Sequence, residues 1–213
     1  MRTLAFDGRM GASGDMLLAA LLAAGADRDA LAPVEAALPI RYEVAETVER
    51  GIGGTTVGVV LTDDGTGEPS KVPDAGLDHS HGDDHSHGDD GHSHGHDEHT
   101  HGDNGDTPAE GHGPSRSYAE VREVVAGMDL PAGVERDALA IFEILGEAEA
   151  AVHGTDLDGT HFHEVGADDA IADVVGVCLL LDDLGVERVV TTPLSAGGGT
   201  VSMSHGTYPV PGP

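Results

Sequence analysis

The chain has 213 residues, of which 39 are acidic and 10 are basic, so its formal net charge is −29. This length accommodates one ordinary domain together with some unstructured chain. The scarcity of basic residues argues against a nucleic acid partner, because phosphate binding needs clustered lysine and arginine. Cys178 is the one cysteine, which excludes an intrachain disulfide and a thiolate-rich metal site.

Residues 1–62 are predicted to form the first part of a structured domain. The sequence indicates a short apolar strand over residues 3–6, a glycine-rich turn, a helix from Asp15 that ends at Gly25, and a shorter helix over 28–38. A strand around residues 42–48, a turn at 51–54 and a strand over 55–61 follow.

Residues 63–114 have a different composition, dominated by Asp, Gly, Ser and His. Ten histidines lie between His79 and His112, and apolar side chains are almost absent. Such a stretch buries too little surface to offset the entropy of ordering it. We therefore predict a long disordered insertion that interrupts the domain.

Residues 115–213 are predicted to form the second part of the same domain. Ser117 and Glu120 indicate a capping box at the start of a helix that runs to about Ala126. The sequence then indicates a helix from Pro131 to about 152, an extended piece at 161–163, a helix over 167–184 and strands at 189–190 and from 200. This order predicts an α/β or α+β fold, a mixed sheet with helices.

The predicted helix over residues 167–184 has a polar and an apolar side. Asp169, Asp173 and Gly176 lie on its polar stripe. Cys178 belongs to the apolar arc, where we expect a buried, unreactive thiol.

The acidity extends over the whole chain and is not confined to the insertion. With Lys71 the one lysine, we interpret the surface as that of a halophilic protein, which stays hydrated in concentrated salt. A surface made for a basic partner is the alternative. No apolar run approaches the ~18 residues of a membrane span, and no signal peptide is recognised, so we expect a cytoplasmic protein without a membrane partner.

The first candidate for chemistry is the junction between the predicted first strand and first helix. Asp7 and Asp15 flank a glycine-rich turn that contains Gly11, Ser13 and Gly14. Glycines let the backbone approach a ligand closely, and the N–H groups at a helix start favour an anion, whereas the two aspartates offer oxygen ligands for a divalent cation. A tight turn with an Asp near the helix start is the structural alternative.

The second candidate is the segment that contains His161, His163 and Glu164. On an extended strand the two imidazoles point to the same face, so both can reach one metal ion. Nearby acids, including Asp169 and Asp173, would complete a nitrogen and oxygen site suited to nickel, zinc or cobalt. Surface or satisfied core histidines are the alternative, and His205 by itself indicates a turn residue.

The third candidate is the histidine-rich insertion. Imidazoles on a mobile tether make a metal buffer of low selectivity, and a solvated low-complexity linker is the alternative. The candidate ligands there are His79, His81, His85, His87, His92, His94, His96, His99 and His101.

Together these segments resemble the LarC-type nickel-insertion family, which serves the nickel-pincer cofactor of lactate racemase. The resemblance lies in residues 6–7 with 11–16, in the run from His161 to Asp173, and in residues 197–201 with 205–211. Arg50 to Gly54 and a histidine-rich insertion at this place also fit the family.

The resemblance implies a nickel chelatase, classed as a lyase. It would insert nickel into pyridinium-3,5-bisthiocarboxylic acid mononucleotide, forming nickel–sulfur and nickel–carbon bonds, with CTP and a divalent cation required. Family sequences continue into a C-terminal domain that binds the nucleotide, and this chain resembles the N-terminal half. A separate C-terminal-half polypeptide and the lactate racemase maturation pathway are therefore the implied partners.

The resemblance makes Asp7, Asp15, His161, His163, Glu164 and His205 candidate nickel ligands, and Gly11, Ser13, Gly14, Asp169 and Asp173 candidate substrate-binding residues. We expect these segments to meet in one cleft, because each by itself offers too few ligands for a divalent ion. A nickel metallochaperone or storage protein without catalysis is the alternative. A metal-dependent hydrolase agrees less well with the sequence, since no pair of a nucleophile and a base stands out.

Overall fold

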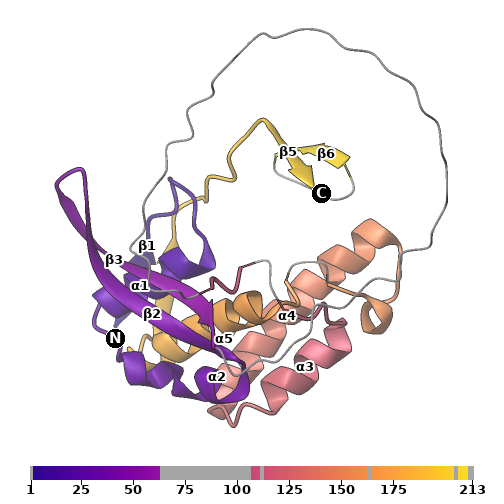
Figure 1. The fold of residues 1–213 in the computed structure, drawn as a ribbon, viewed down its shortest axis with the longest axis horizontal. Coiled ribbons are helices and arrows are strands. Elements are labelled where there is room, and N and C mark those ends of the chain that lie inside the picture. The colour runs from indigo at the N-terminus through magenta and orange to yellow at the C-terminus, as the bar shows by residue number, and fades with distance from the viewer. Residues whose placement is uncertain (1, 63–106, 111–112, 163–164, 204–205, 211–213) are drawn as a thin grey trace, which may run out of the picture.

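The computed structural model describes residues 2–62, 107–110, 113–162, 165–203 and 206–210 (Figure 1). The nine candidate histidines of the insertion lie outside the described residues, and so do His163, Glu164 and His205. The predicted disorder of residues 63–106 and the predicted roles of these side chains therefore stay predictions.

The N-terminal elements agree with the expected order. Strand β1 (Thr3–Phe6) and helix α1 (Gly14–Ala23) flank the glycine-rich turn. The predicted second helix is divided into a 3₁₀ turn, η1 (Arg28–Leu31), and helix α2 (Ala32–Ala37). A proline in the first turn of α2 fits there, because the N–H that it lacks would have no partner within the helix.

Strands β2 (Ile40–Glu49) and β3 (Ile52–Leu61) form a long antiparallel hairpin. The turn predicted over residues 51–54 is wrong in extent, since Gly53 and Gly54 belong to β3. Arg50 and Gly51 close the hairpin by themselves with φ angles of 52° and 83°. Positive φ at both central residues gives a two-residue turn whose twist matches that of the strands.

The predicted C-terminal helices and strands are present, together with a 3₁₀ turn and a final strand that were not predicted. They are α3 (Tyr118–Ala126), α4 (Ala132–His153), a 3₁₀ turn η2 (Leu157–Gly159), α5 (Asp168–Asp183), β4 (Arg188–Thr191), β5 (Thr200–Met203) and β6 (Gly206–Pro209). The capping box of Ser117 and Glu120 is present at the start of α3. In the described ranges no helix is both long and apolar enough to cross a membrane.

The fold mixes helices and strands, as predicted, but the described strands form three separate two-stranded sheets and not one mixed sheet. β1 pairs in parallel with β4, so Phe6 lies beside Thr191. β2 pairs with β3, and β5 with β6, both antiparallel. Because β1 and β4 are parallel, the segments that follow them leave the same edge.

Helix α5 occupies the centre of the core and packs against α1 and η1 as well as α3 and α4 (Figure 1). Gly176, expected on a polar stripe, is buried, and a Cβ there would lie 2.8 Å from the Tyr42 hydroxyl oxygen. That hydroxyl donates a hydrogen bond of 2.6 Å to the Ala172 carbonyl, and burial raises the pKa of the tyrosine. Cys178 is buried, as expected.

The chain returns to the core before the predicted boundary at residue 114. Leu61 N–H donates to the Thr107 carbonyl and Ala109 N–H to the Val59 carbonyl, both at 2.9 Å. Ala109 is fully buried. We call residues 107–110 and 113–117 the return segment, because they lead from the edge of β3 to the start of α3.

The return segment is fastened to the start of α5 by a buried ion pair. Arg116 and Asp168 approach to 2.6 Å, and their side chains are 15% and 3% exposed. The same guanidinium donates a 2.9 Å hydrogen bond to the Gly166 carbonyl. Arg116 therefore joins the return segment to the central helix.

We expect Arg116→Met to lower the free energy of unfolding by about 3–5 kcal/mol, because it leaves the Asp168 carboxylate buried without its partner. Urea denaturation measures this change. Arg136→Met is the matched control, since its pair with Asp137 is exposed and contributes at most about 1 kcal/mol. Equal effects of the two substitutions would contradict the prediction.

Candidate functional site

The loops that follow β1 and β4 are joined to each other. Gly8 N–H donates to the Thr192 hydroxyl at 2.9 Å, and Ser195 N–H donates to the Gly8 carbonyl at 3.0 Å. A Cβ on Gly8 would lie 2.1 Å from a methyl carbon of Leu194. A side chain at residue 8 would therefore displace the end of the Leu194 side chain, which is itself exposed.

Asp7, a predicted metal ligand, is exposed and paired with Arg9. The guanidinium of Arg9 donates to both carboxylate oxygens, at 2.8 and 2.5 Å. This contact lowers the pKa of Asp7. A cation would have to displace the guanidinium in order to bind here.

Four carboxylates gather where α1, α5 and the return segment meet, and we call Asp15, Glu110, Asp169 and Asp173 the acidic cluster. Asp15 lies in the first turn of α1, and the first two turns of α5 carry Asp169 and Asp173. One carboxylate oxygen of Asp169 and one of Asp173, Oδ1 in each, are buried without a hydrogen-bond partner. Such oxygens are ready acceptors for a cation.

Burial, and then the charges of neighbouring acids, disfavour ionisation within the acidic cluster. Burial, followed by the charges of Asp15, Asp169 and Glu110, raises the pKa of Asp173 to about 7. Burial and the charge of Glu110 also raise the pKa of Asp169, against backbone hydrogen bonds that lower it. Neutral pH therefore leaves this cluster with excess negative charge that a bound cation would neutralise.

Gly14 positions the cluster. A Cβ at this residue would lie 2.0 Å from Oδ2 of Asp173, so α1 and α5 can approach only because residue 14 has no side chain. Ser13 precedes α1 without capping it, and its hydroxyl instead donates to Asp15. Gly11 has a φ of 93°, which favours glycine in the turn.

His161 lies at the other end of the return segment. It is exposed and forms an isolated bridge with Ser117, while the neighbouring Phe162 is fully buried against Tyr118 and Phe142. Hydrogen bonds from Ser117 lower the pKa of Glu120, and the charge of His161 adds to this effect. The alternation of an exposed histidine and a buried phenylalanine is that of an extended strand.

The described residues bring together part of the predicted site. Asp15, Asp169 and Asp173 share one cluster with Gly14 beside them, whereas no hydrogen bond or ion pair of the described residues joins His161 to Asp7 or Asp15. Within the described part of the chain, no three His, Cys, Asp or Glu side chains are arranged to hold a metal ion. The single cleft with His163, Glu164 and His205 stays a prediction.

The sequence prediction missed Glu110, which it assigned to the disordered insertion. The signal for order was weak: Pro108 and Ala109 are two small apolar residues at the end of a polar stretch. Pro108 pairs with Val60 at the edge of β3, and this pairing brings Glu110 to the cluster. The pairing is a tertiary contact, so local sequence signals do not predict it.

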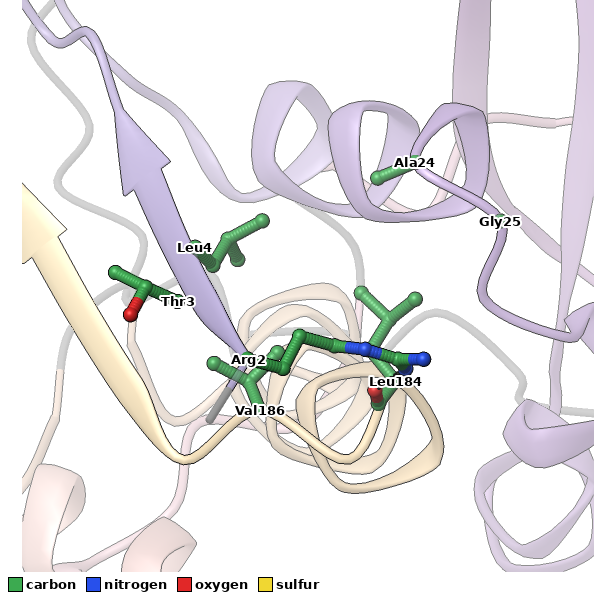
Figure 2. A pocket seen from close by; sticks show the side chains of 7 residues that line it. All are labelled: Arg2, Thr3, Leu4, Ala24, Gly25, Leu184 and Val186. Carbon is green, nitrogen blue, oxygen red and sulfur yellow. Dashed lines mark hydrogen bonds between the residues drawn. The ribbon is translucent and has the colours of Figure 1, made fainter.

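A hollow of about 390 Å³ lies at the opposite end of β1, where α1 and α5 end (Figure 2). Arg2 crosses it and donates to the Leu184 carbonyl at the end of α5. Its lining holds no carboxylate, imidazole or thiol, so it offers no side-chain ligand for a transition metal. Three of the predicted site residues lie in the acidic cluster, which is therefore the candidate site.

We expect Gly14→Ala to destabilise the protein by about 1–3 kcal/mol, because the added methyl group displaces the Asp173 carboxylate. Chemical denaturation provides the measurement. Gly133→Ala, in the first turn of α4 with open space around it, is the control and should be neutral or stabilising. In the Gly14→Ala variant, the further substitution Asp173→Ala should recover part of the lost free energy of unfolding. If it recovers none, the contact between residue 14 and Asp173 is not the cause of the loss.

We expect Asp173→Asn to raise the melting temperature at pH 8 and to have little effect near pH 4. The pKa of Asp173 rises from 3.8 to about 7 on folding, so its contribution to stability is full below about pH 4 and is lost progressively as the pH rises to about 7. Each unit of this shift corresponds to about 1.4 kcal/mol. Asp137→Asn, at an exposed acid, is the control, and a pH-independent difference for Asp173→Asn would contradict the assignment.

Comparison with known proteins places these features in a family. The family profile described as "Nickel insertion protein" matches residues 4–213. A putative nickel insertion protein of Methanococcoides burtonii is 34% identical over 214 residues, which cover 100% of this chain and 42% of that protein. The pyridinium-3,5-bisthiocarboxylic acid mononucleotide nickel insertion protein of Akkermansia muciniphila is 36% identical over 217 residues, covering 100% and 44%.

A shorter match has higher identity. The putative nickel insertion protein of a Picosynechococcus strain is 50% identical over 102 residues, which are 48% of this chain and 25% of that protein. No solved structure matches the chain. The chain spans less than half the length of the curated relatives that it matches in full. With the family profile matched over nearly all of its residues, this chain belongs to the nickel insertion protein family.

Proposed function

We propose that this chain takes nickel as its substrate at the acidic cluster and inserts it into pyridinium-3,5-bisthiocarboxylic acid mononucleotide. It would thereby act as a nickel chelatase of the lyase class in the biosynthesis of the nickel-pincer cofactor of lactate racemase. The family supports the metal, and the name of the Akkermansia muciniphila relative supports the organic acceptor.

The observation that carries the proposal is the pair of buried, unpartnered carboxylate oxygens in the acidic cluster. Removing such oxygens from water without a hydrogen bond costs free energy, and a divalent cation restores that loss. Asp15 and Glu110 add charge at the same place. These features support cation binding at the cluster, where further ligands would have to complete the site, because the described residues hold no group of three ligands.

The proposed donors suit transient binding of nickel. Carboxylate oxygens from the cluster and an imidazole from His161, with His163, Glu164 and His205 as further candidates, form a mixed oxygen and nitrogen set. The thiocarboxylate sulfurs of the acceptor are softer donors than these oxygens. Nickel would therefore pass from the protein ligands to the sulfurs as the acceptor binds.

The glycine-rich turn would receive the phosphate of the mononucleotide. Ser13 leaves the start of α1 without a side-chain cap, so backbone N–H groups of its first turn face outward. Arg9 lies on the same turn and carries a positive charge that a phosphate can attract away from Asp7. This arrangement would place the acceptor beside the acidic cluster.

The complete activity would need the rest of the family polypeptide. CTP and its divalent cation would bind there, in the same chain or in a separate polypeptide, and the reaction would take place in the cytoplasm. The histidine-rich insertion would concentrate nickel near the site and would be dispensable for transfer.

A nickel store or metallochaperone without catalysis is the second candidate, favoured by the nine histidines between His79 and His101. The two functions differ in where nickel must bind. A store depends on the insertion, whereas a chelatase depends on the folded acidic cluster.

We expect the double substitution Asp169→Asn with Asp173→Asn to lower nickel transfer to the acceptor by about 10- to 100-fold. The assay mixes the chain with nickel, acceptor, CTP and the remainder of the Methanococcoides burtonii relative, and mass spectrometry follows the nickel complex. Asp137→Asn removes an exposed acid outside the cluster and should leave transfer unchanged.

Deletion of residues 65–104 distinguishes the two functions. A chelatase should retain transfer while it loses nickel ions bound per chain, as measured by calorimetry. Loss of transfer in the deletion, together with unchanged transfer in the double aspartate variant, would favour the store.

A further inference from the structure

Two large apolar side chains are exposed on the joined loops that follow β1 and β4. Met10 is 91% exposed and Leu194 is 61% exposed. Leu194 lies against Gly8, two residues before Met10, and backbone hydrogen bonds hold the loops together. We call residues 8–11 and 192–195 the loop platform. Both apolar side chains thus lie on two loops that are joined to each other, so a partner bound on these loops would bury both.

The hairpin of β5 and β6 extends from the same platform. The segment over residues 193–202 is exposed throughout, and Figure 1 shows the hairpin apart from the helices. Each of its strands has four residues, and in the described part of the chain they pair only with each other. A two-stranded hairpin of this length is marginally stable without a surface to pack on.

The length of the relatives indicates which polypeptide binds this surface. All of this chain aligns with 42% of the Methanococcoides burtonii protein, so more than half of that polypeptide has no counterpart here. The family match extends over the loop platform and the hairpin. The loop platform also leads directly into Ser13 and Asp15. A polypeptide bound on it would therefore lie next to the acidic cluster.

We infer that the loop platform and the β5–β6 hairpin form the docking surface for the remainder of the family polypeptide. That part presents an apolar patch for Met10 and Leu194, bordered by lysine and arginine that complement a chain of net charge −29. This inference concerns assembly and depends on family membership, so it does not require the proposed nickel chemistry.

The test measures binding between this chain and the part of the Methanococcoides burtonii relative that has no counterpart in it. Isothermal titration calorimetry with the unchanged 213-residue chain should show a 1:1 complex. Met10→Ser combined with Leu194→Ser should weaken the complex by about tenfold or more, because buried apolar anchors dominate interface energies. Both side chains are exposed, so circular dichroism should show an unchanged fold.

Ile144→Ser is the matched control, since Ile144 is 68% exposed but lies on α4, away from the loops. It should bind like the unchanged chain. Absence of binding by the unchanged chain, or equal weakening by Ile144→Ser, would overturn the inference. The assay contains no nickel or acceptor, so its outcome is independent of the transfer experiment.

Discussion

Helix α5 carries three aspartates in its first two turns and still packs in the centre of the protein, and the rest of the structure depends on how these carboxylates are accommodated. Asp168 is neutralised by Arg116, which fastens the return segment to the core. Asp173 fits against α1 because residue 14 is a glycine. Asp169 and Asp173 each keep an oxygen without a partner. The acids of α5 thus hold the return segment through an ion pair, and they require a glycine where α1 packs against α5.

The same arrangement explains why the candidate site lies at this end of the molecule. β1 and β4 are parallel, so the loops that follow them leave one edge, and α1 begins there as well. Burial and mutual repulsion keep Asp173 partly protonated near neutral pH. Carboxylates without partners destabilise the metal-free protein. A bound cation would remove this destabilisation, and the free energy gained would favour its binding.

The relation between the acidic cluster and the histidine segment is indirect in the described residues. The return segment contacts β3 at Thr107, brings Glu110 to the cluster, and reaches His161 through Ser117. One stretch of chain therefore connects the two groups of predicted ligands, with the start of α5 between them. The long insertion ends where this segment begins, which places its histidines in sequence next to the site that they would supply.

The sequence by itself determined the identity and order of the secondary structure, because these depend on local signals. Local sequence patterns predicted α1, α4 and α5, and the capping box located the start of α3 to the residue. The glycine-rich turn and the three aspartates of the site were also recognised from local patterns. The family resemblance rested on the same motifs, and the comparisons confirmed it.

Only the tertiary structure decided which of these residues meet. The contact of Gly14 with Asp173, the pair of Arg116 with Asp168 and the arrival of Glu110 each join residues far apart in the sequence. Gly176, assigned to the polar stripe of α5, was buried for the same reason, since periodicity reports which residues share a face but not what packs against it. β1 likewise pairs with β4, because their pairing depends on where the helices between them place each strand, whereas the other two sheets are hairpins of consecutive strands. Long-range packing, not local preference, therefore assembled the site.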